Sequence, residues 1–585
     1  MSLRQRRRRR RAPSDNLQVI TDTISVISFP MKQIHSTRRL RDTERRPSHA
    51  PGLRPGWALA LLLTLSACGG GGGDSAPATG STAAPAASAS DPAATLPIDG
   101  VATFESVPST RAGLTYGAGS AKPIRGAVVE IVDGAGATVA TTVTNANGAY
   151  RAFVRPNSTV SVRIKAQTTQ SAGATAADVS VRDNTNGDAI YALQTPAFDV
   201  GSIPFVRNVS APSGWTGNGY GAARAAAPFA ILDTIYTTQA KLLSVAPATA
   251  FPPLQVFWSV NNRPAAGNAA QGDIGSTAFT SNARGFAIYV LGRENVDTDE
   301  YDASVVAHEW GHYYQAAFSR DDSIGGPHSS NDRLDFRVAF SEGWGNAWSG
   351  IALGRDDYTD SFGPQQAQAA RTSLSNAAVP SPGWFREDSI QSILWNLNQQ
   401  VGFKGIHDAF TGTLRRGAAV TSIHSFAAAY GAASPNEAPV LARLLGGQAI
   451  SPATNDAFGT SETNNGGVPS ALPLYRGVTV GGSTQVCVNY EAGTGNRLGN
   501  FAYLRFTAPA ARTYAITATG GAGSNPSLAV WGAGSGLIAA SSASGSTDSV
   551  SPRLPAGDIV ISVNDINVND INDSIASPCF TVTIQ

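Results

Sequence analysis

The sequence predicts a multidomain chain in which two β-sandwich units flank a central unit of mixed helices and strands (α+β). Three observations support this prediction. The 585 residues exceed what a single hydrophobic core usually organises. Short alternating apolar segments separated by turn residues dominate both ends, whereas longer helix-like segments occupy the middle. The composition shifts at about Val206 and Ser470, so the expected units are residues 101–205, 206–469 and 470–585.

Residues 1–67 have the pattern of an export leader. A short apolar segment, Trp57–Leu65, follows many arginines, is too short to span a bilayer permanently, and ends in Leu65-Ser66-Ala67-Cys68. This pattern resembles a bacterial lipoprotein signal, which implies cleavage before Cys68 and acylation of its sulfur. Gly69 stands where an inner-membrane retention signal has aspartate, so we expect a membrane anchor in the outer membrane or at the cell surface.

The charge distribution separates the leader from the rest. Before Cys68, 14 Lys and Arg stand against 4 Asp and Glu, an excess of ten, so the overall +1 leaves −9 for the remainder. The run Arg6–Arg11 leaves with the leader, which excludes nucleic acid as a partner. Met1 and Met31 are the only methionines, and the true start stays open between them. Residues 68–100, rich in small residues and proline, predict a flexible linker.

The first folded unit, residues 101–205, is predicted from alternating strands and turn residues. Asn147-Gly148 has the composition of a hairpin turn. The expected strands are Ala127–Val132, Val139–Val143, Ala149–Val154 and Thr159–Ile164. The unit resembles the carboxypeptidase regulatory-like sandwich, which implies a spacing or docking role and no catalysis.

A pair of histidines is the most informative feature of the central unit. The motif His308-Glu309-Trp310-Gly311-His312 lies in Asp302–Phe318, which predicts a buried helix because Asp302 is a candidate N-cap and the segment lacks proline. Histidines four residues apart on a helix face one side and can hold a divalent ion, with Glu309 beside it. The chain has only seven histidines, which disfavours chance pairing over a metal site; a solvated histidine face is the alternative.

A carboxylate occurs downstream in a second apolar, helix-like segment, Val338–Trp348. Glu342 stands there among Phe340, Trp344 and Trp348, and a carboxylate in such surroundings requires a cation. The alternative is a capping box, if Glu342 lies at the start of its helix.

These two segments resemble the gluzincin metallopeptidases, with the nearest likeness to the fungalysin and thermolysin families. The resemblance lies in Val305-Val306-Ala307-His308-Glu309 and in Glu342-Gly343-Trp344-Gly345-Asn346. It implies a thermolysin-like α/β fold, one Zn²⁺ held by His308, His312 and Glu342, and Glu309 as general base. Asn346 departs from the family, which has an aspartate there to orient a zinc histidine; an asparagine carbonyl can accept the same hydrogen bond without the charge.

Segments upstream of the histidine motif resemble further features of the family. The expected helix Phe229–Val245 and strand Leu254–Val260 precede a strand at Phe286–Leu291, which the resemblance makes the substrate-binding edge. Asn282 and Ala283 resemble the family's asparagine-alanine substrate contact. The alternative, that Asn282 belongs to an ordinary sheet strand, has equal weight.

The donor that stabilises the oxyanion is not settled by the sequence. The family uses a histidine or tyrosine after the glutamate ligand, and a helix-like segment, Trp384–Leu397, lies there without a histidine. The candidates are Arg386, His407, His424 and Tyr430. The Gly-Ala-Met-Glu-Asn segment of zinc aminopeptidases does not occur in the sequence, which favours an endopeptidase.

The last unit, residues 470–585, resembles the bacterial pre-peptidase C-terminal domain and predicts a β-sandwich or jelly-roll. Cys487 and Cys579 flank it, and an exported location permits a disulfide between them, with two buried thiols as the alternative. The segments 564–567 and 569–573 are oxygen-rich and suggest calcium, although a solvated turn is favoured. The expected strands are Gly477–Val480, Phe501–Phe506, Thr513–Ala518, Leu528–Trp531, Asp558–Val563 and Phe580–Ile584.

Together these patterns lead us to expect a zinc-dependent metalloendopeptidase, acting on protein or peptide substrates, in a cell-envelope lipoprotein. A catalytically inactive adhesin or surface-binding lipoprotein that keeps the peptidase fold is the alternative. Zinc-dependent hydrolysis of a non-peptide substrate is a third, without a positive sign in the sequence.

Overall fold

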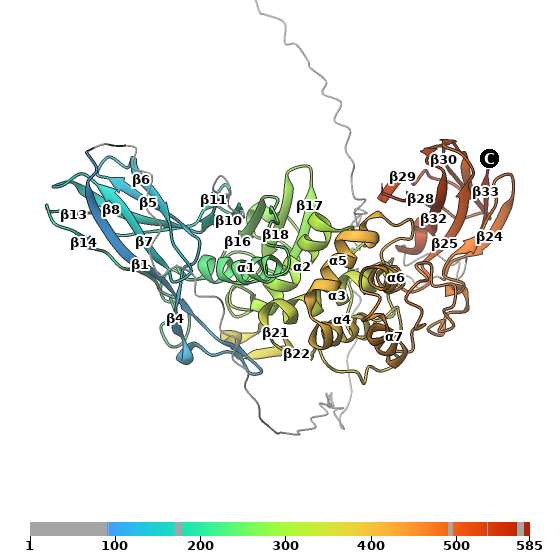
Figure 1. Cartoon of the computed structure of the whole chain (residues 1–585), viewed down its shortest axis with the longest axis horizontal. Helices are drawn as coiled ribbons and strands as arrows, with labels where there is room; N and C mark the ends of the chain where they lie inside the picture. The colour runs from blue at the N-terminus through green and yellow to red at the C-terminus, as the bar shows by residue number, and fades with distance from the viewer. Residues whose placement is uncertain (1–90, 92, 170–177, 490–494, 535, 570–577) are drawn as a thin grey trace, which may run out of the picture. The chain divides into compact units, whose positions relative to one another are not determined.

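A computed structural model provides the fold (Figure 1) and describes residues 91, 93–169, 178–489, 495–534, 536–569 and 578–585. The expected leader, most of the linker and the lipidation site Cys68 lie outside these residues. None of the described helices combines the length and apolar character needed to cross a bilayer.

Two β-sheets near the N-terminus share one apolar core, in which Ile98 and Ile131 are fully buried. The first sheet is built around β1 (Leu96–Ser106), which pairs with β4 (Ser120–Pro123), β7 (Ala149–Val154), β14 (Phe205–Val206) and β15 (Val209–Ala211). The second contains β5 (Val128–Asp133), β6 (Thr138–Val143), β8 (Thr159–Lys165), β12 (Ala192–Gln194) and β13 (Phe198–Asp199). A small ribbon joins β2 (Ser109–Thr110) to β3 (Gly113–Leu114). The four strands expected from the sequence are confirmed as β5 to β8.

The expected limits of this unit, 101 and 205, do not coincide with its strand pairing. Strand β1 begins at Leu96, inside the expected linker, and its parallel partner β15 lies beyond residue 205. Conversely, β10 (Val179–Asp183) pairs with β16 (Leu254–Trp258) of the central unit. The Asn147-Gly148 turn forms, with Gly148 at φ +72°, but it joins strands of different sheets, so the expected hairpin does not. These pairings span long separations that local composition does not encode.

A six-stranded mixed sheet organises the central unit, in the order β11-β10-β16-β18-β17 with β9 on β10. The remaining strands are β9 (Gln167–Thr168), β11 (Ala189–Ile190), β17 (Ala278–Asn282) and β18 (Gly285–Val290). A four-stranded sheet adds β19 (Gly292–Arg293), β20 (Asp297–Thr298), β21 (Asp357–Phe362) and β22 (Gln368–Ser373). The edge of the larger sheet is β17, so the expectation that Phe286–Leu291 forms this edge is wrong: that segment is β18, which lies between β16 and β17.

Helices make up much of the rest of the central unit (Figure 1). The predicted buried segments are confirmed as α1, α2, α3 and α4. The helices are α1 (Ala227–Leu243), α2 (Ala303–Phe318), α3 (Phe336–Leu353), α4 (Glu387–Val401), α5 (Phe403–Ala409), α6 (Ile423–Ala433) and α7 (Ala438–Gly447). Asp302 occupies the N-cap position of α2 without capping it, because its carboxylate instead accepts hydrogen bonds from Ser109 and Ser361.

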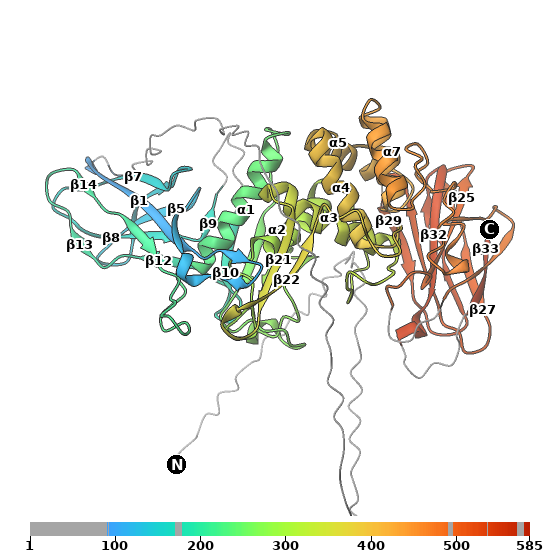
Figure 2. The same ribbon diagram turned by 90° about the horizontal axis from the view of Figure 1, so that it is seen from below.

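Two sheets enclose a separate apolar core in the C-terminal unit (Figure 2). One contains β23 (Arg476–Gly477), β25 (Phe501–Ala508), β32 (Gly557–Asp565), β28 (Pro526–Gly532) and β29 (Gly536–Ser541). The other contains β24 (Ser483–Cys487), β33 (Cys579–Ile584), β27 (Ile516–Gly520) and β30 (Thr547–Val550), and β26 (Arg512–Thr513) pairs with β31 (Arg553–Leu554). The expected Cys487–Cys579 disulfide is confirmed and joins directly opposed residues of β24 and β33.

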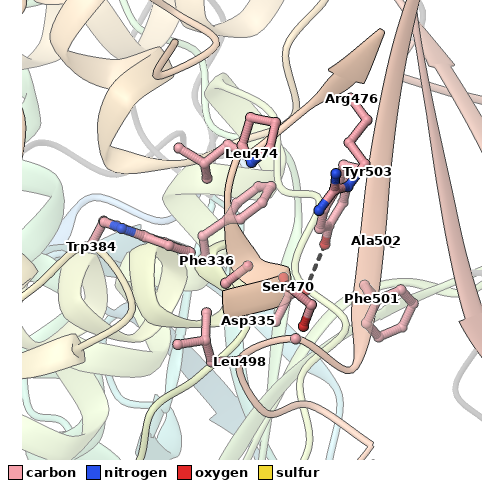
Figure 3. Close-up of a pocket in the computed structure, with 13 residues that line it drawn as sticks. Asp335, Phe336, Trp384, Ser470, Leu474, Arg476, Leu498, Phe501, Ala502 and Tyr503 are labelled. Atoms are coloured by element: carbon pink, nitrogen blue, oxygen red, sulfur yellow. Dashed lines mark hydrogen bonds between the residues drawn. The ribbon is translucent and has the colours of Figure 1, made fainter. Parts of the chain in front are cut away.

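The start of α3 contacts the C-terminal unit at a small pocket (Figure 3). The Tyr503 hydroxyl, on β25, donates to Oδ2 of Asp335, the N-cap of α3, at 2.6 Å. Phe336 lies against the Tyr503 ring with centroids 4.5 Å apart. Arg337 is buried, donates to Asp335 at 2.9 Å, and lies over the ring of Phe501. The helix that carries Glu342 is therefore anchored at its first turn by side chains of β25.

Candidate metal centre

Helix α2 directs both motif histidines to one side, as their spacing predicts. His308 and His312 are 8% and 9% exposed, and their Nε2 atoms lie 3.0 Å apart. Two glycines bring α3 close to this face. A Cβ at Gly311 would lie 3.1 Å from Cα of Gly345, and a Cβ at Gly345 would lie 2.8 Å from the His308 ring. Helices in such contact place side chains of α3 directly over the histidine pair.

Glu342 reaches that pair from the middle of α3. Its Oε2 lies 3.2 Å from Nε2 of His308 and 3.4 Å from Nε2 of His312. The position, well inside α3, excludes the capping-box alternative. Tetrahedral zinc with ligands at about 2.0–2.2 Å separates its ligand atoms by about 3.3–3.5 Å. The three separations fall at or just below that value, so these donors fit one zinc ion.

Each histidine is oriented through its other ring nitrogen. Nδ1 of His308 donates to Oδ1 of Asn346 at 2.9 Å, which is the contact expected of Asn346 from the sequence. Nδ1 of His312 lies 3.1 Å from Oγ of Ser341, and the Ser341 hydroxyl is placed to donate to Oδ2 of Asp321 at 3.3 Å. These bonds leave both Nε2 atoms free to face Glu342 and an ion.

The charges of the centre support one another. Burial opposes ionisation of His312, but the carboxylate of Glu342 outweighs it and raises the pKa of His312 to about 9. Burial likewise raises the pKa of Glu342, but His312 and then His308 outweigh it and hold that pKa well below its usual range. Without an ion the pocket therefore holds an anionic carboxylate against a protonated imidazole, and a bound cation would take the place of that proton.

Glu309 lies beside the three donors and faces the sheet. Its Oε2 accepts a hydrogen bond from the backbone N–H of Phe279, in β17, at 2.6 Å. Burial raises the pKa of Glu309, opposed by His308 and His312. The residue thus lies between the donors and the edge strand of the sheet.

Sequence reasoning did not assign His328, which reaches the same centre from the loop between α2 and α3. Its Nε2 lies 3.4 Å from Oε2 of Glu342 and 3.5 Å from Oε2 of Glu387, and its side chain is 29% exposed. Burial opposes its charge, but Glu342 and Glu387 outweigh it and raise its pKa. Tyr358, in β21, was also missed, and its ring centroid lies 5.9 Å from that of His308. Neither residue has a motif or periodicity that would have revealed it.

The expected oxyanion donors have partners elsewhere. His407 accepts or donates a hydrogen bond at 2.9 Å with the buried Tyr314 hydroxyl, and His424 pairs with Glu462 at 2.9 Å. Arg386 donates to the carbonyl of Asn331, and Tyr430 packs against Phe426. These partners of the four residues do not belong to the centre, whereas His328 contacts Glu342.

The remaining sequence candidates lie away from Glu309. Asn282 ends β17, its Oδ1 accepts from the N–H of Arg284 at 2.8 Å, and Ala283 lies in the exposed hairpin turn. The strand residue next to Glu309 is Phe279 instead. Of the oxygen-rich C-terminal stretch, Oδ1 of Asp565 accepts from the backbone of Asn525 and Asn567, and residues 570–573 lie outside the described residues.

No family model matches the sequence, and no curated protein matches it. Among solved structures, the chain resembles the pre-peptidase C-terminal domain of a collagenase from Bacillus anthracis, with 8% identity and a TM-score of 0.16 over 19% of this chain and 94% of that one. It also resembles PliG of Aeromonas hydrophila, a periplasmic inhibitor of g-type lysozyme, with 17% identity and a TM-score of 0.13 over 19% of this chain and 98% of that one. At these values neither similarity bears on function.

Proposed function

We propose that this chain is a zinc-dependent endopeptidase that hydrolyses peptide bonds of protein substrates. One observation carries the proposal: Oε2 of Glu342 lies within 3.4 Å of both motif imidazoles, while Glu309 lies between them and an edge strand. The lipoprotein leader ending at Cys68 adds the proposal that the enzyme acts at the cell envelope.

Three protein donors leave one position of a tetrahedral zinc ion open, which distinguishes a catalytic site from a closed structural one. His308, His312 and Glu342 would hold the ion. When bound, zinc supplies Lewis acidity at the reacting carbonyl. The hydrogen bonds that His308 and His312 form with Asn346 and Ser341 fix the ring orientations that this binding needs.

Glu309 is the general base of the proposed reaction. The N–H of Phe279 holds Oε2 in place, so Oε1 is the oxygen available to the attacking water. Glu309 would take a proton from that water and pass it to the departing amine. His328, whose Nε2 lies 3.4 Å from Oε2 of Glu342, is the group proposed to stabilise the oxyanion.

The position of strand β17 at the edge of its sheet favours an extended peptide as the substrate. It is the last strand of its sheet, and along its outer edge no further strand pairs with it among the described residues. The pairing of Asn282 with Gly285 across a two-residue turn makes Phe279 a residue whose N–H points away from β18. The N–H of Phe279 is bonded to Glu309, so an extended peptide would pair with the other outward backbone groups of this edge, a mode that admits many side chains.

The decisive experiment measures zinc content and digestion of casein by the full chain. Glu309→Gln should retain zinc and lose activity by about 10²–10⁴-fold, because the ligands remain while the base is removed. Glu462→Gln is the matched control, since it alters a buried His–Glu pair away from the centre. It should retain activity.

Each other outcome points to a different function. Zinc binding without cleavage of any protein substrate by the wild type would replace the proposal with the inactive surface-binding lipoprotein. Activity on esters or glycans but not on peptides would indicate a zinc hydrolase of another substrate class.

A further inference from the structure

We infer that Asp297, Asp299 and Asp360 form a second cation site, separate from the histidine centre, which binds a hard divalent ion with calcium as the best match. The inference does not depend on the proposed peptidase activity. It rests on Asp297 of β20, on Asp299 directly after that strand, and on Asp360 of β21; β20 precedes α2 and β21 follows α3.

Strand register forces these carboxylates together. Asp297 is paired with Phe362 in the antiparallel ladder of β20 and β21. Continuing that register places Asp299 opposite Asp360, and one oxygen from each of the three aspartates lies within 4.8 Å of the other two. Like charges directly opposite each other destabilise a sheet. Twice a calcium–oxygen distance is about 4.6–5.2 Å, so one ion can touch all three.

Each of the three side chains has an oxygen without a partner. Oδ1 of Asp297, Asp299 and Asp360 is buried and accepts no hydrogen bond. Asp299 is only 2% exposed, and its other oxygen accepts a hydrogen bond from Thr277. Buried carboxylate oxygens are costly unless something binds them. Because one oxygen of each side chain lies within 4.8 Å of the other two, a single cation could bind all three carboxylates.

Two buried or half-buried arginines of this region are engaged elsewhere. Arg224 pairs with Glu300 at 3.1 Å, and both side chains are buried. Arg355 binds Ser304 and lies 4.0 Å from Asp357. The cluster therefore lacks a protein counter-charge from these two guanidinium groups.

Burial is the largest cause that raises the pKa of all three carboxyl groups. Repulsion from Asp360 adds to the rise at Asp297, and repulsion from Asp297 and Asp360 adds to it at Asp299, whereas a hydrogen bond with Asp299 opposes the rise at Asp297. Without an ion the cluster would have to hold protons or repel itself at neutral pH. Donors that are all oxygen match calcium or magnesium rather than zinc, and calcium tolerates an irregular arrangement completed by water.

A bound ion would brace the walls of the histidine centre. Thr277, which donates to Asp299, directly precedes β17 and also accepts the N–H of Leu291 at 2.9 Å. Asp302, at the start of α2, accepts the N–H of Ser361, the residue after Asp360, at 3.1 Å. The ion would thus connect β17, the start of α2 and β21.

The test is calcium titration of the full chain after EGTA treatment and dialysis, followed by calorimetry and by thermal melting in calcium or EGTA. The wild type should bind calcium and melt at least about 4 °C higher in calcium than in EGTA. Asp299→Asn should lose this binding. In EGTA it should melt above the wild type, because it relieves repulsion, and in calcium below it. Asp548→Asn, which alters a buried carboxylate with an unpartnered oxygen but no acidic cluster, should bind calcium like the wild type.

Two results would overturn the inference: no heat or melting shift at millimolar calcium in the wild type, or equal calcium binding by Asp299→Asn, which would assign the ion to another part of the chain. If Asp299→Asn fails to fold, Asp360→Asn serves in its place. Calcium binding should persist in Glu309→Gln and after zinc chelation, so failure of the peptidase proposal would leave this result unchanged.

Discussion

Oδ1 of Asn346 lies 2.9 Å from Nδ1 of His308, one helical turn beyond Glu342 on α3. An amide oxygen can only accept there, so the contact sets which ring nitrogen of His308 carries the proton and turns Nε2 toward Glu342. It does so without the negative charge that an aspartate would add.

Removal of the Asn346 side chain should weaken zinc binding without unfolding α3. We expect Asn346→Ala to lower zinc affinity by about 10–100-fold, because His308 loses its orienting partner. Asn346→Asp should raise affinity, because a carboxylate makes the imidazole a stronger donor. Competition with a chromogenic chelator measures both. Equal affinities in the three proteins would show that the contact does not tune the metal.

Gly345→Ala should disable the centre by displacement of His308. The new methyl group would lie 2.8 Å from the ring, closer than carbon atoms approach. We expect zinc content and casein cleavage to fall together while circular dichroism keeps its helical signal. Gly446→Ala in α7 is the matched control, since a methyl group there meets open space. Normal activity of Gly345→Ala would mean that α3 shifts to accommodate it.

His328→Asn tests the proposed oxyanion donor. We expect kcat to fall by about 10²–10³-fold while KM and zinc content stay near the wild-type values, because the residue would act in the transition state. His407→Gln, which changes the partner of Tyr314 instead, should leave kcat unchanged. Loss of zinc from His328→Asn would instead make this residue a ligand.

Asp302→Asn should change how stability depends on pH. Burial raises the pKa of Asp302 from 3.8 to about 8, against hydrogen bonds from Ser109 and Ser361. A raised carboxyl pKa favours the protonated folded state, so its contribution is complete below pH 4 and is lost as pH rises toward 8. In EGTA, where no ion neutralises Asp360, the free energy of unfolding of the wild type should fall relative to the variant by up to about 1.4 kcal/mol per pH unit in this range. The prediction is wrong if the urea-denaturation midpoints of the wild type and of Asp302→Asn differ by the same amount at pH 5 and at pH 8.

The helical part of the centre could be predicted because its information is local. Residues 308 and 312 share a face of any helix, and the apolar neighbours of His308 and Glu342 indicate buried helices, so α2 and α3 follow from local composition. The close approach of α2 and α3 depends on Gly311 and Gly345, and nothing in the sequence indicates that these two glycines face each other.

The parts that were missed depend on contacts between distant segments. Strand β17 (Ala278–Asn282) is too short and too polar to be predicted from its sequence. It is an edge strand because, among the described residues, it pairs only with β18. His328 lies in a loop without periodicity. The strand pairing crosses the limit expected at residue 205, because β15 returns to β1 across about a hundred residues while β10 joins a later sheet.

The hydroxyl of Tyr503 on the cap of α3 has a practical consequence for anyone who shortens this protein. Asp335 and Arg337 are buried against β25, and Glu342 follows on the same helix. Removal of the chain from residue 476 onward would expose the buried Asp335–Arg337 ion pair and Phe336 to solvent. The loss of packing at the start of α3 would then displace Glu342 on the same helix. A trimmed catalytic fragment should therefore be a poor substitute for the intact protein.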